Sequence, residues 1–148
     1  GICVASNLTV VNTYLAHFIA CGPSWIWTDA IRPLVSELGA TPGRLVFAVD
    51  WGVLQQVDYY GNGKIGSHRN SDGIVTGLPD PVSAEPLGRI LADPATLFVT
   101  HVEGIEAFPG VRRKMIDFAS ERGYQDHLLK TIHDRHGAPI FEIHEFRK

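Results

Sequence analysis

The sequence predicts an α/β protein, a three-layer sandwich with a mixed, mostly parallel sheet and a C-terminal β-hairpin. Two short apolar runs at residues 44–51 and 97–102 predict buried strands, because continuous runs of this length are typical of strands covered on both faces. Segments with helical spacing alternate with these strands, which favours helices above and below one sheet. Two extended segments close the chain and predict a hairpin at one edge of that sheet.

Length and composition are consistent with one globular domain. The chain has 148 residues, of which 45% are hydrophobic and 20% are charged, and this length is sufficient for a single core. A formal net charge of −3 argues against nucleic-acid binding, which normally requires a basic face. We therefore expect residues 1–148 to form one α/β domain, with no nucleic acid among its partners.

The first helix is predicted over residues 7–20. Apolar pairs recur there every four residues, which marks one face of a helix: Val10/Val11, Tyr14/Leu15 and Phe18/Ile19. Ser6 or Asn7 would cap this helix, and Gly22-Pro23 would end it.

The next three elements surround the first apolar run. A second helix is predicted from the capping pair Thr28-Asp29 to Leu38, with Gly39 just beyond its end. A turn then leads into the strand at 44–50. Residues 53–60 are predicted to form a short helix that Gly61 closes.

A long polar segment precedes the second apolar run. Residues 65–80 are rich in Gly, Ser, Asn and Asp and show little periodicity, so they are predicted to form a solvated loop. A helix should start at Pro81 or Ser83 and stop at Asp93-Pro94. The strand at 97–102 follows.

The C-terminal third is predicted to contain one helix and the hairpin. Pro109-Gly110 open a helix, with Val111, Met115, Phe118, Ala119 and Arg122 at helical spacing as core packing. The hairpin strands are predicted at about 127–134 and 139–146, and Pro139 can open the second strand because a missing donor does least harm there.

Polar residues end both apolar strands and make a candidate binding site. Asp50 follows the first strand, which we expect to be central, and His101 and Glu103 end the second. Open α/β sheets bind ligands at the carboxyl ends of their strands, where a carboxylate beside an imidazole can share a proton or bind a sugar hydroxyl or a cation. The alternative, which we favour, is structural: Asp50 caps the following helix and His101 is hydrogen-bonded at a strand end.

Aromatic and metal-binding residue types add little to this site. Trp51 follows Asp50 directly and joins the candidate binding residues, because aromatic faces can stack on sugar rings, although tryptophans such as Trp25 and Trp27 are more often core anchors. His133 and His136 lie on the predicted hairpin, where their spacing does not converge two imidazoles. The two cysteines are distant from them, so no metal site and no cofactor is expected.

Several short segments together resemble a known family. They are Trp27-Thr28-Asp29-Ala30-Ile31, Asp50-Trp51-Gly52, Val99-Thr100-His101, Phe108-Pro109-Gly110 and Gly137-Ala138-Pro139-Ile140-Phe141-Glu142-Ile143. In this order they resemble the C-terminal extracytoplasmic domain of bacterial membrane glycosyltransferases of the dolichyl-phosphate-mannose–protein mannosyltransferase-like family (family 39). The resemblance covers nearly the whole chain.

This resemblance implies an accessory role rather than catalysis. Enzymes of this family transfer a sugar from a polyprenyl-phosphate donor, using carboxylates of a membrane part that has no counterpart here, so no catalytic residue carries over to this chain. The implied location is the extracytoplasmic (periplasmic) side of the inner membrane. The implied partners are the membrane-embedded part of the same polypeptide and a sugar or acceptor, with residues 1–22 as a helix leading from that membrane part. The resemblance further implies that the apolar face of this helix packs on the domain and on the membrane part.

Two other interpretations remain open. One is a free-standing small-molecule-binding domain or enzyme that uses Asp50, His101 and Glu103 in a strand-end crevice. The other is a purely structural interaction module. A deep polar pocket joining Asp50 and His101 would favour the enzyme, whereas side chains bonded to backbone at a shallow surface would count against it.

Overall fold

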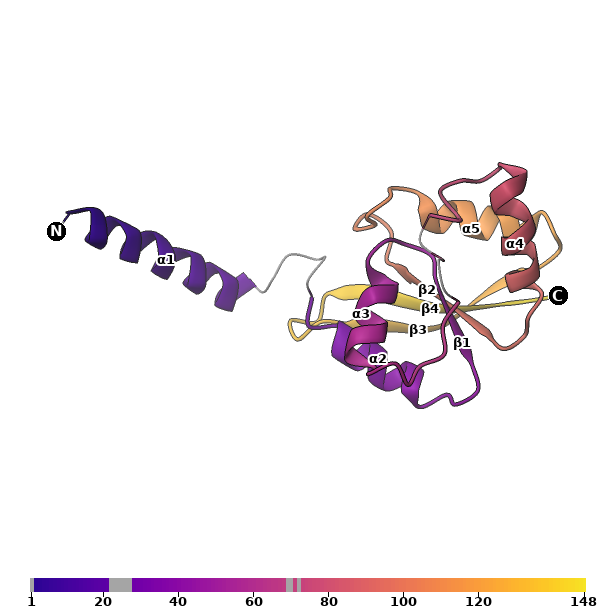
Figure 1. Ribbon diagram of the computed structural model, residues 1–148, viewed down its shortest axis with the longest axis horizontal. Helices are drawn as coiled ribbons and strands as arrows, with labels where there is room; N and C mark the ends of the chain where they lie inside the picture. Colours follow the sequence, from indigo (N-terminus) through magenta and orange to yellow (C-terminus); the bar gives the residue numbers. More distant parts are fainter. Residues whose placement is uncertain (1, 22–27, 69–70, 72) are drawn as a thin grey trace.

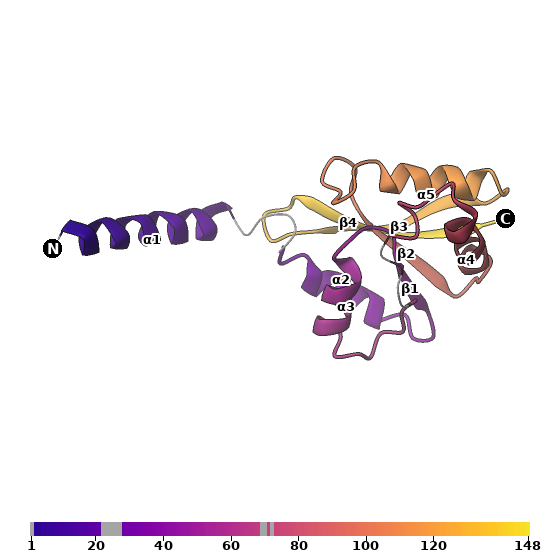
Figure 2. The same cartoon turned by 45° about the horizontal axis from the view of Figure 1, so that its top comes forward.

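The protein is a three-layer α/β sandwich with one helix outside the layers. The structure, a computed structural model, describes residues 2–21, 28–68, 71 and 73–148. Its elements in chain order are α1 (Ile2–Cys21), α2 (Ile31–Gly39), β1 (Leu45–Ala48), α3 (Val53–Tyr60), α4 (Pro81–Leu91), β2 (Thr96–His101), α5 (Val111–Ser120), β3 (Gln125–His133) and β4 (Pro139–Arg147). Helices α2 and α3 cover one face of the sheet, and α4 and α5 cover the other (Figures 1 and 2). The predicted α/β class and its layers are confirmed.

The sheet is mixed and has the order β1-β2-β4-β3. Strands β1 and β2 are parallel, whereas β4 is antiparallel to both β2 and β3. The mixed sheet and the C-terminal hairpin are therefore confirmed. The expectation that parallel pairing predominates is wrong, because the hairpin inserts its second strand beside β2 and so adds two antiparallel pairs.

Strand β1 lies at one edge of the sheet, so its expected central position is wrong. Its outer side is nevertheless covered by a short segment of the following loop. The Val46 amide donates to the Gly66 carbonyl (N···O 2.8 Å), and the His68 amide donates to the Val46 carbonyl (2.8 Å). Since this segment and the helices bury β1 on all sides, its sequence has the apolar run that is typical of a central strand.

The segment 65–80 is packed against the domain, so the prediction of a solvated loop is wrong in part. Ser71 and Val75 are fully buried. Val75 belongs to the core under α4 and α5, with Ile74 and Leu78 packed beside it. The polar composition of this segment predicted solvation, but a few apolar residues among many Gly, Ser and Asp residues suffice to anchor a loop.

Two apolar clusters occupy the two faces of the sheet. The cluster under α2 and α3 includes Ile31, Leu34, Leu38, Val53, Leu54, Val57 and Phe141. The cluster under α4 and α5 includes Phe47, Leu87, Phe98, Val111, Met115, Phe118, Ala119 and Phe146. Four of the five residues in the predicted stripe of α5 are thus core residues. Arg122 instead covers the Phe118 ring, with its guanidinium carbon 3.5 Å from the ring centroid.

Helix α1 extends away from the layered domain (Figures 1 and 2). The expected helix is present, but the expectation that its apolar face packs on the domain is wrong, because its large apolar side chains are exposed: Leu8, Val10, Val11, Tyr14, Leu15 and Ile19. The expected helix stop at Gly22-Pro23, the two tryptophans Trp25 and Trp27, and the side chains of Cys3 and Cys21 lie outside what the structure describes. Within the described residues, no helix is both long and apolar enough to cross a membrane.

The packing of the 65–80 segment can be tested with one buried valine. Val75 is 0% exposed, so Val75→Ala removes two buried methyl groups and should lower the free energy of unfolding by about 2 kcal/mol. Val82 is 82% exposed, and Val82→Ala is a matched control that should change it by less than about 0.5 kcal/mol. Urea unfolding measures both. Equal effects of the two substitutions would contradict the packed arrangement.

Candidate functional site

The parallel pairing of β1 and β2 brings Asp50 and His101 together. Ala48 of β1 pairs with Val99 of β2, so the residues two positions further along each strand lie side by side. Gly52 then turns the chain into α3 with a positive φ of 82°. Residues other than glycine rarely adopt this backbone conformation. Asp50 is 0% exposed and His101 is 1% exposed.

The Asp50 carboxylate accepts four hydrogen bonds from within the domain. One oxygen, Oδ2, accepts from Nδ1 of His101 (2.6 Å) and from the Ala107 amide (2.7 Å). The other, Oδ1, accepts from the amides of Trp51 (2.8 Å) and Phe108 (3.1 Å). An ionised carboxylate offers about four lone-pair positions and no proton. All of its acceptor capacity is therefore used internally, and Nδ1 of His101 carries the shared proton.

These bonds keep Asp50 ionised despite its burial. Burial alone would raise the pKa of this carboxyl, but the hydrogen bonds from His101 and from the amides of Ala107 and Trp51 outweigh it and hold the pKa below 3.8. Bonds to the charged form of a carboxyl favour that form. A negative charge is thus fixed at the ends of β1 and β2.

The pair is enclosed by the domain. The His101 ring packs against the ring of Phe141 on β4, with centroids 5.0 Å apart and an interplanar angle of 33°. The cavities beside α5 and along α1 are lined by other residues. Neither Asp50 nor His101 can reach a substrate in this conformation, because both are at most 1% exposed.

Asp50 anchors the loop between β2 and α5 rather than the helix that follows it. Helix α3 has Gly52 at its N-cap and no side-chain cap, so the expected capping by Asp50 is wrong. The bonds to Ala107 and Phe108 instead hold the distant loop. Glu106 in the same loop accepts hydrogen bonds from the amides of Gly110 (2.9 Å) and Arg112 (3.0 Å) and thereby satisfies the start of α5.

The other predicted site residues lie at the surface. The side chain of Trp51 is exposed, as is Glu103. The structure therefore brings together Asp50 and His101 but leaves Trp51 and Glu103 as surface residues beside them.

A second charged cluster, which sequence reasoning missed, lies between the sheet and α5. Arg112 on α5 donates to Glu142 on β4 (Nε···Oε2 2.6 Å). The same Glu142 oxygen lies 3.1 Å from Nε2 of His144, whose Nδ1 is 2.7 Å from Oδ1 of Asp126 on β3. The alternation of Glu142 and His144 on one face of β4 was available in the sequence. The contributions of Asp126 and Arg112 depend on tertiary packing.

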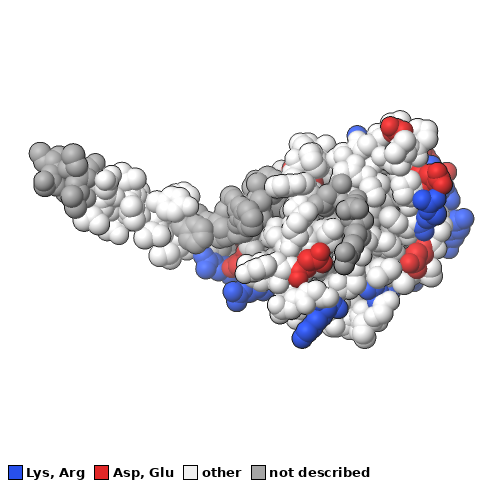
Figure 3. Space-filling view, viewed as in Figure 1, with Lys and Arg blue, Asp and Glu red and all other residues white. Residues whose placement is uncertain are grey.

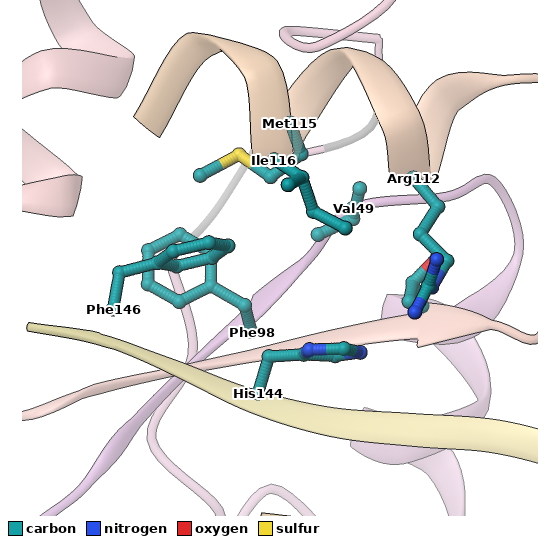
Figure 4. A pocket seen from close by; sticks show the side chains of 8 residues that line it. Val49, Phe98, Arg112, Met115, Ile116, His144 and Phe146 are labelled. Carbon is teal, nitrogen blue, oxygen red and sulfur yellow. The ribbon is translucent and has the colours of Figure 1, made fainter. Parts of the chain in front are cut away.

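This cluster joins three elements electrostatically. Both ring nitrogens of His144 face carboxylate oxygens, so His144 can donate to both only as an imidazolium. Figure 4 shows His144 and Arg112 beside a small cavity under α5, which is also lined by Val49, Phe98, Met115, Ile116 and Phe146. Its volume of about 10 Å³ admits one water molecule at most. We interpret the cluster as a structural network and not as a ligand site.

Metal binding has no supporting geometry in the described residues. There, no group of three or more His, Cys, Asp or Glu side chains is arranged so that it could hold a metal ion. His133 and His136 on the hairpin are both exposed. What the contacts of Asp50 show is that its buried charge fixes the backbone of Ala107 and Phe108.

Removing the charge of Asp50 should destabilise the fold. Asp50→Asn places an NH2 group, which cannot accept a hydrogen bond, opposite at least one of the four donors. Breaking a buried charge pair typically lowers the free energy of unfolding by about 3 kcal/mol. Glu103→Gln is the matched control on the exposed loop and should change the free energy of unfolding by less than about 0.5 kcal/mol. Urea unfolding at neutral pH gives both values. An Asp50→Asn variant as stable as the control would overturn the structural role.

The same carboxylate predicts an acid-sensitive stability. The pKa of Asp50 lies below 3.8 in the fold, whereas in the unfolded chain it is near 3.8. The unfolded chain therefore binds this proton more readily, and the stabilisation is complete above about pH 4 and is lost as the pH falls through the folded pKa. The difference in unfolding free energy between wild type and Asp50→Asn should shrink as the pH falls below about pH 4. A difference that grows between about pH 5 and about pH 3 would contradict this sign.

The interpretation of this site depends on its geometry, because comparisons with known proteins found no match. No protein-family model, no curated protein and no solved structure matches the chain significantly. The resemblance to the family 39 glycosyltransferases therefore stays a prediction that depends on the short segments quoted above.

Proposed function

We propose that this chain is an accessory domain of a membrane glycosyltransferase that transfers a sugar from a polyprenyl-phosphate donor, and that it is not catalytic alone. The domain belongs on the extracytoplasmic side of the membrane. Its partner is the membrane-embedded part of the same polypeptide. The short segments that resemble the family 39 proteins support this proposal, and two features of the structure add to the support.

The observation that carries the proposal is the complete internal use of the Asp50 carboxylate. A catalytic carboxylate must come within about 2.6–3.2 Å of the group that it serves. Asp50 is instead surrounded by four donors of its own chain and is 0% exposed. A free-standing enzyme using the strand-end crevice would need Asp50 and His101 to open toward solvent. These contacts therefore favour a supporting role over catalysis.

The second supporting feature is α1. Its twenty residues include no Asp, Glu, Lys or Arg, and six of its large apolar side chains are exposed. A helix that exposes many large apolar side chains and carries no charge normally packs against apolar surroundings, such as a partner protein or a membrane. The sandwich does not provide such surroundings for α1, which supports a membrane-embedded neighbour.

The proposal predicts that the purified chain is catalytically inert. Incubation with polyprenyl-phosphate-linked sugar donors and acceptor peptides or glycans should give no transfer above the protein-free reaction. The measurement is release of radiolabelled sugar from the lipid carrier.

The Asp50→Asn variant is the control for contaminating enzymes. Turnover by the wild-type chain that this substitution abolishes would contradict the accessory role and would favour the strand-end enzyme.

A further inference from the structure

Several features that lie apart in the sequence come together at one end of the sheet. Strands β1 and β2 are parallel and β4 is antiparallel to β2, so the carboxyl ends of β1 and β2 lie at the same end as the turn between β3 and β4. Arg135 in that turn donates to the carbonyl of Ile19 near the end of α1 (3.3 Å). Arg135 also pairs with Asp29 just before α2 (3.5 Å). We call this the α1 end of the domain, and Figures 1 and 2 show α1 leaving from it.

Two exposed aromatic residues lie at the α1 end on a fixed backbone. Trp51 is 49% exposed and Phe108 is 41% exposed. Their amides donate to the same Oδ1 atom of Asp50, although the two residues belong to different connections of the chain. The buried carboxylate therefore holds two aromatic residues near each other while their rings face outward.

The neighbouring α1 surface is apolar and uncharged. Leu8, Val11, Leu15 and Ile19 are each at least 47% exposed, and the helix carries no charged residue. In Figure 3 the described part of α1 is free of Lys, Arg, Asp and Glu, whereas charged side chains lie where the helix meets the domain and toward the opposite end of the domain. An apolar helix and two outward aromatic rings thus occur at the same end.

We propose that the α1 end of the domain contacts a lipid bilayer, with Trp51 and Phe108 at the level of the lipid headgroups. This inference depends on the proposed function for the presence of a membrane beside the domain. Tryptophan is enriched at membrane–water interfaces because its ring system is apolar and its N–H can meet water. An exposed phenylalanine can insert its apolar ring at the boundary between headgroups and acyl chains. A sugar is the less favoured occupant, because the depression beside Phe108 is lined by Thr76, Pro109, Val111 and Lys114 and does not include Trp51.

The contact can be tested with Trp51 as the reporter. The chain has three tryptophans, so Trp25→Phe and Trp27→Phe leave Trp51 as the single tryptophan in the full chain. The probe is vesicles of phosphatidylcholine and phosphatidylglycerol, in which part of the phosphatidylcholine is brominated near the headgroup. Trp51 emission should shift to shorter wavelength and be quenched by the bromines.

A tryptophan at the opposite end is the matched control. Lys148 follows the end of β4, at the far end of the sheet from Asp50. Lys148→Trp in a chain with Trp25→Phe, Trp27→Phe and Trp51→Phe should show neither the shift nor the quenching. Equal quenching at both ends, or no quenching of Trp51 in chains that float with vesicles, would overturn the proposal. Chains that float without quenching of Trp51 would indicate that protein, and not lipid, contacts Trp51. A chain that does not float would overturn it as well.

Removal of the two rings supplies an independent measurement. Trp51→Ala with Phe108→Ala should weaken vesicle partitioning about tenfold. Val82→Ala with Leu128→Ala removes exposed apolar side chains elsewhere on the domain and should leave partitioning within about twofold. Similar partitioning of both double variants would count against the proposal. The vesicles contain no sugar donor, so this result does not depend on whether the chain transfers sugar.

Discussion

The fold depends on one buried carboxylate at the ends of two strands. Asp50 joins β1 to His101 of β2 and to the backbone of the loop that leads into α5. An unpaired charge at a site with 0% exposure would be strongly unfavourable. Four hydrogen bonds offset that cost and tie β1, β2 and the loop before α5 together. Ile105 in the same loop also packs against the cluster under α2 and α3, so buried charge and apolar contact hold the loop together.

The position of Asp50 at the ends of two parallel strands does not give it a binding or catalytic role. The carboxyl ends of parallel strands are where α/β proteins commonly bind ligands, and the sequence places an acid and an imidazole there. Their presence alone does not make a site, because a group that binds its own backbone is not available to a substrate. The groups left at the surface are Trp51, Phe108 and Glu103. They are suited to contact with a neighbour and less to bond making, which agrees with the proposed accessory role.

Sequence patterns predicted local structure better than position in the sheet. The continuous apolar run of β1 indicates that the strand is buried. Part of that burial comes from residues 66–68, which cover the outer edge of the strand. The packing of Val75 depends on contacts with α4 and α5 that no local pattern shows. The pairing of Asp50 with His101 followed from the parallel register. The bonds to Ala107 and Phe108, and the network of Arg112, Glu142, His144 and Asp126, arise only in the tertiary structure.

Amide hydrogen exchange measured by NMR tests the role of Asp50 most directly. The amides of Ala107 and Phe108 lie in a loop outside helices and strands, so their protection would come from the Asp50 carboxylate. We expect both to exchange nearly as slowly as the amides of β2 in the wild-type chain and to lose protection in Asp50→Asn. Exchange of Ala107 and Phe108 in the wild type as fast as that of Gly104 in the same loop would show that Asp50 does not hold this segment.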